Sequence, residues 1–191
     1  MLAKGFTYKE YYSWGEDVRC ELINGVPCMM SAPGLWHQLT VGKVHRQVDE
    51  FLDGKPCQAL VAPFDVRLFP EPDESDMVVL QPDVLVVCDR EKLSDGKACT
   101  GAPDFVVEVV SEGSLKNDFV VKKALYEKAG VREYWVIDNE EVYQYVLRDG
   151  KYYENVHKLE EGLIVEVDVL PGCAVCFRGI ADPGSPRKGP D

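Results

Sequence analysis

The chain has 191 residues, of which 46% are hydrophobic and 28% charged, and its formal net charge is −12. This length and composition indicate one globular domain with a sizeable core, and we expect no second domain. The excess of acid argues against a broad surface for polyanions, because such surfaces rest on many Lys and Arg contacts. A cleft with a metal ion at its floor is compatible with this charge, because a divalent cation reverses the local electrostatics.

The predicted elements begin with a short aromatic helix at 7–12. The Asn24-Gly25 step is a hairpin signal and places Glu21 near the end of an early strand. Apolar residues then recur with the period of an amphipathic helix over 34–53, and this helix carries His37. Four strands are predicted after it, at 57–61, 64–69, 83–88 and 104–110.

The second half of the chain continues with a helix at about 117–129, which stops at Gly130, where a C-terminal glycine cap is expected. Strands follow at 133–138, 142–147 and 152–157. Asp149-Gly150 is the second hairpin turn, and the tail 182–191, rich in Pro, Gly and charge, is expected to be disordered beyond a domain over 1–181. The order of elements predicts an α/β fold in which helices flank a mixed sheet.

Neither a membrane anchor nor a disulfide framework is expected. No apolar run approaches the ~20 residues that span a bilayer, and Met1 to Gly5 is not followed by the apolar stretch of a secretory signal, so we expect a cytoplasmic protein. The seven cysteines are odd in number and scattered, which favours reduced, buried thiols. The Cys-x-x-Cys pair, Cys173 and Cys176, has no second pair to complete a zinc site.

Two acidic residues lie on apolar runs that are predicted to be strands. Asp83 leads into 84–87, and Glu108 lies inside 105–110. A carboxylate in a buried strand costs free energy unless it is paired or binds a cation, so two of them suggest a metal site. Each also has a simpler interpretation, since Pro82-Asp83 could be a strand-entry turn and Glu108 could face solvent at a strand edge.

Asp118, Lys122 and Tyr126 recur every four residues in the predicted helix, and this spacing places them on one helix face. Lys122 could simply pair with Asp118 across one turn, and Asp118 and Tyr126 could support the site residues or serve helix packing.

Several short motifs follow one another along the chain at compatible spacing. They are Glu21-Leu22-Ile23-Asn24-Gly25, His37-Gln38, Pro82-Asp83-Val84, the run 103–111, Asp118 with Lys122 and Tyr126, and the run 130–138. Together they resemble the Uma family of restriction endonucleases, which belongs to the PD-(D/E)XK nuclease superfamily, over roughly residues 7 to 180. The stretch 111–114, Ser-Glu-Gly-Ser, departs from the Ser-Pro-Ser-Thr-like stretch of the family.

The resemblance implies a restriction endonuclease-like fold and a site for Mg²⁺ or Mn²⁺. Asp83 and Glu108 would be the metal-binding carboxylates, close enough to share one cation, and the backbone carbonyl of Val109 a further ligand. This assignment is chemically reasonable, because phosphodiester hydrolysis needs a hard cation held by oxygen ligands, an activated water and positive charge near the reacting phosphate.

The superfamily's lysine, two residues after the second acid, is replaced here by Val110. The family pattern nominates Lys122 on the following helix instead, and Lys122 is favoured over Lys123 because the neighbour is rotated about 100° away. We expect Lys122→Ala to lower cleavage by 10²-fold or more with little change in folding. Glu21 and His37 match further polar positions of the family and are expected to line the same cleft, with His37 as a proton carrier.

The function implied by the resemblance is a Mg²⁺-dependent endonuclease that hydrolyses DNA, and cutting both strands makes a homodimer plausible. Two alternatives stay open. One is a binding or regulatory module that keeps the nuclease fold without cleavage, which the acidic composition makes credible. The other is a metal-dependent hydrolase of a small phosphorylated substrate.

Overall fold

A six-stranded mixed sheet forms the centre of the molecule in the computed structural model, which describes residues 5–15, 18–110 and 117–180. Its strand order is β11-β10-β9-β8-β6-β3. The strands are β3 (Gln58–Val61), β6 (Val84–Val87), β8 (Phe105–Val109), β9 (Glu133–Ile137), β10 (Glu141–Arg148) and β11 (Lys151–Lys158). β8 and β9 are parallel, and the other neighbours are antiparallel. This confirms the predicted α/β fold with a mixed sheet.

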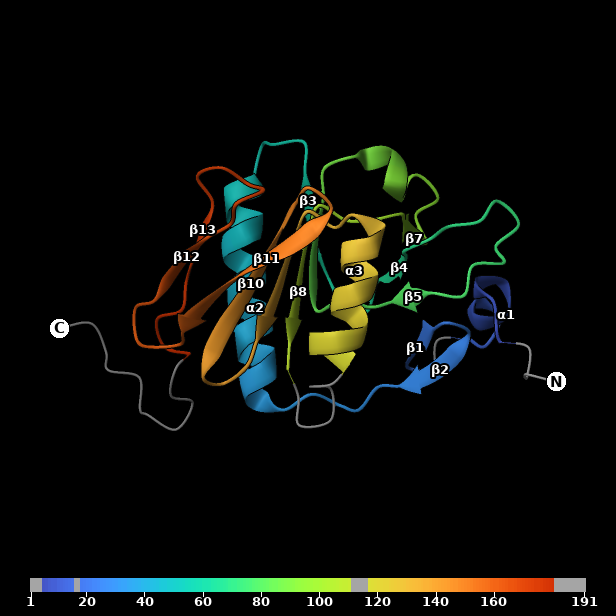
Figure 1. The fold of residues 1–191 in the computed structure, drawn as a ribbon, viewed down its shortest axis with the longest axis horizontal. Coiled ribbons are helices and arrows are strands. Elements are labelled where there is room, and N and C mark those ends of the chain that lie inside the picture. Colours follow the sequence, from blue (N-terminus) through green and yellow to red (C-terminus); the bar gives the residue numbers. More distant parts are fainter. Residues whose placement is uncertain (1–4, 16–17, 111–116, 181–191) are drawn as a thin grey trace.

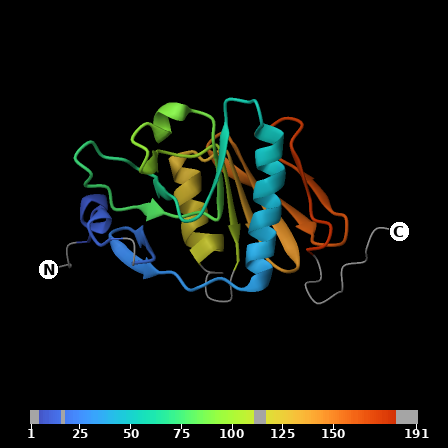
Figure 2. The same ribbon diagram turned by 180° about the vertical axis from the view of Figure 1, so that it is seen from behind.

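Helices lie on both faces of this sheet, as the two opposite views in Figures 1 and 2 show. On one face α2 (Leu35–Leu52) buries Val44 and Val48 in a core that also holds Val84, Val107 and Trp135. On the other face α3 (Lys123–Ala129) packs against residues of the alternate set on the same strands, among them Leu85, Val106 and Tyr134. Because side chains alternate along a strand, Glu108 points to the α3 face.

Two smaller sheets complete the fold. The five-stranded one has the order β2-β1-β5-β4-β7 and consists of β1 (Cys20–Ile23), β2 (Val26–Met29), β4 (Asp65–Arg67), β5 (Val79–Leu80) and β7 (Ala98–Thr100). The two-stranded one pairs β12 (Ile164–Glu166) with β13 (Ala174–Cys176). β5, β7, β12 and β13 were not predicted, because two or three residues are too few to show a periodic pattern.

Both predicted hairpin turns are confirmed. Asn24 and Gly25 have φ of 51° and 78°, and Asp149 and Gly150 have φ of 51° and 75°, so both central residues of each turn are left-handed, as type I′ turns require. Gly25 is required for a second reason, because a Cβ at that position would lie 2.7 Å from the Cα of Gly5. The first turn fixes the register of β1 and therefore the position of Glu21.

The short helices match the sequence in part. α1 (Tyr8–Tyr12) begins with a capping box in which Thr7 and Glu10 bond each other's backbone N–H groups, and η1 (Arg90–Leu93) is a 3₁₀ turn. The segment predicted as one helix over 117–129 instead begins as a π-helix, η2 (Asn117–Lys122), and becomes α-helical only in α3. Its end is as expected, since Gly130 caps α3 with φ of 88° and donates to the carbonyls of Tyr126 and Glu127.

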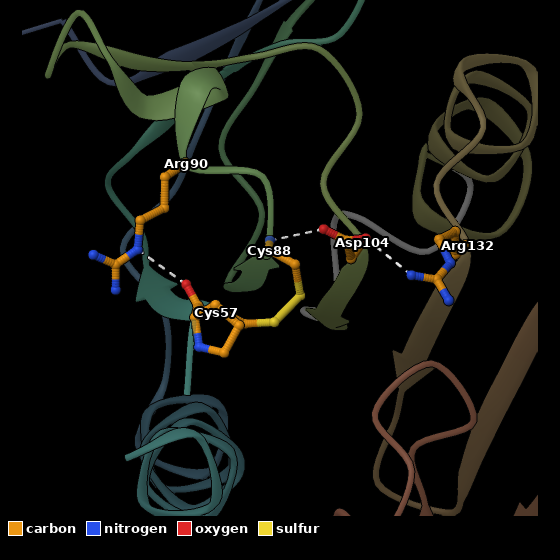
Figure 3. Close-up of a disulfide and its surroundings, with 6 residues drawn as sticks. Cys57, Cys88, Arg90, Asp104 and Arg132 are labelled. Carbon is orange, nitrogen blue, oxygen red and sulfur yellow. Dashed lines mark hydrogen bonds and ion pairs between the residues drawn. A yellow bond between two sulfur atoms is a disulfide. The ribbon is translucent and has the colours of Figure 1, made fainter. Parts of the chain in front are cut away.

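The expectation that the cysteines are reduced is wrong for one pair. Cys57 and Cys88 form a disulfide, shown in Figure 3, in which the Cys88 N–H also donates to Asp104 at 2.8 Å. Cys57 precedes β3 and Cys88 follows β6, and the pairing of Gln58 with Val87 makes the cysteines the next partners across the two strands. The free cysteines of the described residues are Cys20, Cys28, Cys99, Cys173 and Cys176.

The described ranges contain no helix that is both long and apolar enough to cross a membrane. The departure at 111–114 and the predicted disordered tail at 182–191 lie outside the described residues.

Candidate active site

The side chain of Lys122 lies buried among three carboxylates. Its ammonium nitrogen is 2.9 Å from Glu21 Oε1, 2.9 Å from Glu108 Oε1 and 3.4 Å from Asp118 Oδ1. The Lys122 side chain is only 6% exposed, and none of the three acidic side chains exceeds that value. Glu21 comes from β1, Glu108 from β8 and Asp118 from η2. The ion pairs therefore join the five-stranded sheet, the six-stranded sheet and η2.

Each member of this cluster is held by a further hydrogen bond. The backbone N–H of Gln81 donates to Glu21 Oε1 at 2.9 Å, and the hydroxyl of Tyr126 donates to Glu108 Oε1 at 3.0 Å. The hydroxyl of Tyr134 donates to the carbonyl of Asp118 at 3.0 Å, which fixes η2 on the sheet. These contacts orient Lys122 and its partners before any ligand arrives, and such preorganisation is required of catalytic groups.

Asp83 and His37 form the second part of the site. Asp83 Oδ2 accepts from the backbone N–H of Val109 at 2.7 Å and lies 3.2 Å from His37 Nε2. Both side chains are mostly buried, and Nδ1 of His37 is buried without a hydrogen-bond partner among the described residues. When Nε2 carries the proton that Asp83 accepts, Nδ1 presents a lone pair and can take a proton.

Burial and the excess of negative charge in the cluster together shift the pKa values of Glu108 and Lys122. Burial, with the nearby charges of Asp118, Glu21 and Asp83, raises the pKa of Glu108 well above its ordinary value, although Lys122 opposes the shift. Burial lowers the pKa of Lys122, but attraction to Glu108, Glu21 and Asp118 outweighs it and raises that pKa. Lys122 therefore stays charged, while Glu108 takes up a proton or a cation more readily than an exposed glutamate.

Within the described residues there is no group of three or more His, Cys, Asp and Glu side chains arranged to hold a metal ion. Two oxygens are nevertheless suited to a hard cation. The contacts of Asp83 fall on Oδ2 and those of Glu108 on Oε1, so Oδ1 of Asp83 and Oε2 of Glu108 accept no hydrogen bond from the described residues. This donor set of carboxylate oxygens fits Mg²⁺ or Mn²⁺.

The predicted side chains form two contact groups, Lys122 with Glu21 and Glu108, and Asp83 with His37. The two groups adjoin at β8, where Glu108 is followed by Val109, whose N–H binds Asp83. The predicted role of the Val109 carbonyl as a metal ligand stays a prediction. Lys123 is directed elsewhere, 3.8 Å from Glu154 and over the ring of Tyr145.

Two contributors were not among the predicted site residues. Gln81 acts through its backbone N–H, which has no sequence signal. Tyr126 was expected either to support the site residues or to serve helix packing, and its hydrogen bond to Glu108 favours the first.

Comparison with known proteins bears on the fold and the family of the chain. A crystal structure of a putative nuclease belonging to DUF820, from Anabaena variabilis ATCC 29413, superposes with a TM-score of 0.72 at 16% sequence identity, covering 92% of this chain and 97% of that chain. This likeness shows the shared fold. No curated protein matches the chain significantly.

The model of the Uma2 family, described as putative restriction endonuclease, matches residues 8–178. That span holds the main sheet, both long helical segments and every residue of the site described above. The chain therefore belongs to the Uma2 family of putative restriction endonucleases.

Proposed function

We propose that this protein is a metal-dependent endonuclease that hydrolyses phosphodiester bonds of DNA. The observation that carries the proposal is the buried ammonium of Lys122 between Glu21 and Glu108, beside two carboxylate oxygens that accept no hydrogen bond from described residues. Positive charge held next to a cation site is what a reacting phosphodiester requires. Family membership and the shared fold support the same reaction class.

Asp83 and Glu108, with the carbonyl of Val109, would hold Mg²⁺ or Mn²⁺. The bound ion would supply Lewis-acid stabilisation of the phosphate and a more acidic water. Lys122 adds a fixed positive charge on the α3 side, and Glu21 positions Lys122 by accepting from its ammonium at 2.9 Å.

His37 is suited to proton transfer. Its Nε2 faces Asp83 at 3.2 Å, which orients the ring and leaves Nδ1 to accept a proton. Because a double-strand cut usually needs two active sites, we propose a homodimer as the form that acts on duplex DNA.

Cleavage of supercoiled plasmid in the presence of Mg²⁺ or Mn²⁺ tests this function. Glu108→Gln is the most informative variant, because it keeps the shape of the side chain and leaves Lys122 paired with Glu21 and Asp118, so the fold should persist. We expect it to lower the cleavage rate by at least about 10²-fold. Glu154→Gln on β11, whose side chain is 47% exposed, is the matched control and should cleave like wild type.

The same assay separates the alternatives. Binding of DNA without metal-dependent cleavage by the wild type would favour a binding or regulatory module. Turnover of small phosphorylated compounds with plasmid left intact would favour a metal-dependent hydrolase of a small phosphorylated substrate.

A further inference from the structure

A cavity outside the candidate active site is lined in part by Gln81, whose backbone N–H binds Glu21. Its volume of about 670 Å³ is in the range of small-molecule sites. It is lined by side chains of α1, of the segments around β1 and β4, and of the β5–β6 connection, including Tyr11, Tyr12, Arg19, Phe64, Asp65 and Gln81, with Lys97 nearby at its wall. None of these residues has a role in the active site except Gln81, through its backbone.

Three polar residues of this cavity, Gln81, Asp65 and Tyr11, bond one another, and the Tyr11 hydroxyl also lies 3.2 Å from the carbonyl oxygen of Cys20. Gln81 Nε2 donates to Asp65 Oδ1 at 2.8 Å and to the hydroxyl of Tyr11 at 3.1 Å, and the Tyr11 hydroxyl lies 3.0 Å from the same Asp65 oxygen. A carboxylate can only accept hydrogen bonds, so the amide atom of Gln81 that contacts Asp65 is the nitrogen and not the oxygen. Both amide hydrogens are used, and the described residues donate nothing to Gln81 Oε1 or Asp65 Oδ2. Within this set of three residues, the polar groups left for a ligand are therefore two acceptors.

The walls of the cavity combine aromatic rings with positive charge. The Tyr12 side chain is 52% exposed, and the ammonium of Lys97 lies 5.0 Å from its ring centroid. Neither Lys97 nor Arg19 forms an ion pair within the described part of this acidic chain. Exposed rings that can stack on a base, beside cations that can meet a phosphate, are typical of sites for unpaired nucleotides.

The cavity is tied directly to the candidate active site. The N–H of Gln81 binds Glu21, and Asp83 follows two residues later, so the chain between the two sites spans at most about 7 Å. Arg19 precedes Glu21 by two residues in the same way. A nucleotide in the cavity would therefore have its neighbouring phosphate close to the carboxylates.

We propose that this cavity binds the base of an unpaired or extruded nucleotide next to the phosphate that is cleaved, and that it prefers a base with an exocyclic amino group over thymine. The N4 amino group of cytosine or the N6 amino group of adenine offers two N–H donors, one for each free acceptor, whereas the pairing edge of thymine offers only the single N3–H between two carbonyl acceptors. The proposal rests on the proposed function and adds a substrate preference to it.

Fluorescence anisotropy with labelled oligo-dC, oligo-dA and oligo-dT, without divalent cation, tests the preference. Wild type should bind oligo-dC and oligo-dA about 10-fold tighter than oligo-dT. Asp65→Asn keeps the shape and the acceptor for Gln81 but replaces the free oxygen by a donor, so it should reduce or reverse this ratio. Tyr12→Ala should weaken all three, and Tyr153→Ala, an exposed tyrosine on β11, should weaken none.

Equal affinity of wild type for the three oligonucleotides, no binding to any of them, or an unchanged ratio in Asp65→Asn would overturn the proposal. The outcome is separable from that of the plasmid assay. Base preference without plasmid cleavage would support base binding in the cavity and reject the nuclease function. Plasmid cleavage without base preference would support the nuclease function and reject base binding in the cavity.

Discussion

Lys122 is the residue on which the charge balance of the site depends. Its ammonium contacts Glu21 and Glu108 at 2.9 Å in a buried environment, so its removal leaves carboxylates without their counter-charge. The sequence-based expectation that Lys122→Ala hardly affects folding is therefore wrong in its physical premise. That expectation considered the lysine only as a catalytic group and did not count the cost of leaving Glu21, Glu108 and Asp118 without its charge.

We predict that Lys122→Met, in the presence of chelator, lowers the free energy of unfolding by about 3–5 kcal/mol, because breaking a buried ion pair on one side is strongly destabilising. Lys123→Met is the matched control. Its ammonium meets the exposed Glu154 at 3.8 Å, so its loss should cost about 1 kcal/mol or less. Urea denaturation of both variants measures the difference, and equal losses would contradict the buried charge cluster.

Glu133 is a fully buried acid outside the site. It accepts from Trp135 Nε1 at 2.7 Å, from Gln144 Nε2 at 2.8 Å and from the N–H of Val169 at 2.9 Å. Burial raises its pKa above the ordinary 4.5, although these hydrogen bonds oppose the shift. The residue therefore holds a proton in the folded state at pH values where the unfolded chain has lost it.

The sign of the pH dependence follows from this difference. Above pH 4.5 the unfolded state binds fewer protons at Glu133 than the folded state, so the contribution of Glu133 to the free energy of unfolding falls as pH rises through the folded pKa. We predict that the stability of wild type minus that of Glu133→Gln decreases from pH 4.5 towards neutral pH in urea titrations. A difference that is constant or increases with pH would show that the pKa of Glu133 is not raised.

At the scale of elements, long periodic segments were predictable and short or long-range features were not. α2 and β8 lie within one residue of their predicted ends, because an 18-residue amphipathic helix and an apolar run carry their own signal. The hairpin turns were equally clear. The π-helical start of η2 was missed, since a four-residue spacing fits both helix types, and the five-stranded sheet depends on contacts between short segments far apart in sequence.

The disulfide links the ends of β3 and β6. The sequence did not show that these two strands pair with each other, so it could not predict the bond. Its two cysteines are 31 residues apart, and closing a loop of that size should stabilise the fold by about 3–4 kcal/mol through the unfolded state. We predict that dithiothreitol lowers the melting temperature of wild type. The double variant Cys57→Ser with Cys88→Ser should melt at a lower temperature than untreated wild type, and dithiothreitol should not change its melting temperature. A response of the double variant equal to that of wild type would contradict the assignment.

At the scale of the whole molecule, the net charge of −12 and the nuclease-like fold are reconciled by where the charges lie. Several acids are concentrated around Lys122, and the cavity beside Gln81 has two cations without ion-pair partners among the described residues. The motifs predicted which acids converge, because Asp83 and Glu108 stand out on apolar runs. They could not predict the cavity, which α1 and four other segments build from residues without a shared pattern.

The central claim, that Asp83 and Glu108 share a catalytic cation beside Lys122, is tested most directly by a crystal structure of the protein soaked in Mn²⁺. We predict one anomalous peak within about 2.0–2.6 Å of Asp83 Oδ1 and Glu108 Oε2, with the ammonium of Lys122 still bound to Glu21. A fully soaked crystal without a peak at this position, or with Mn²⁺ only at surface carboxylates, would contradict the claim.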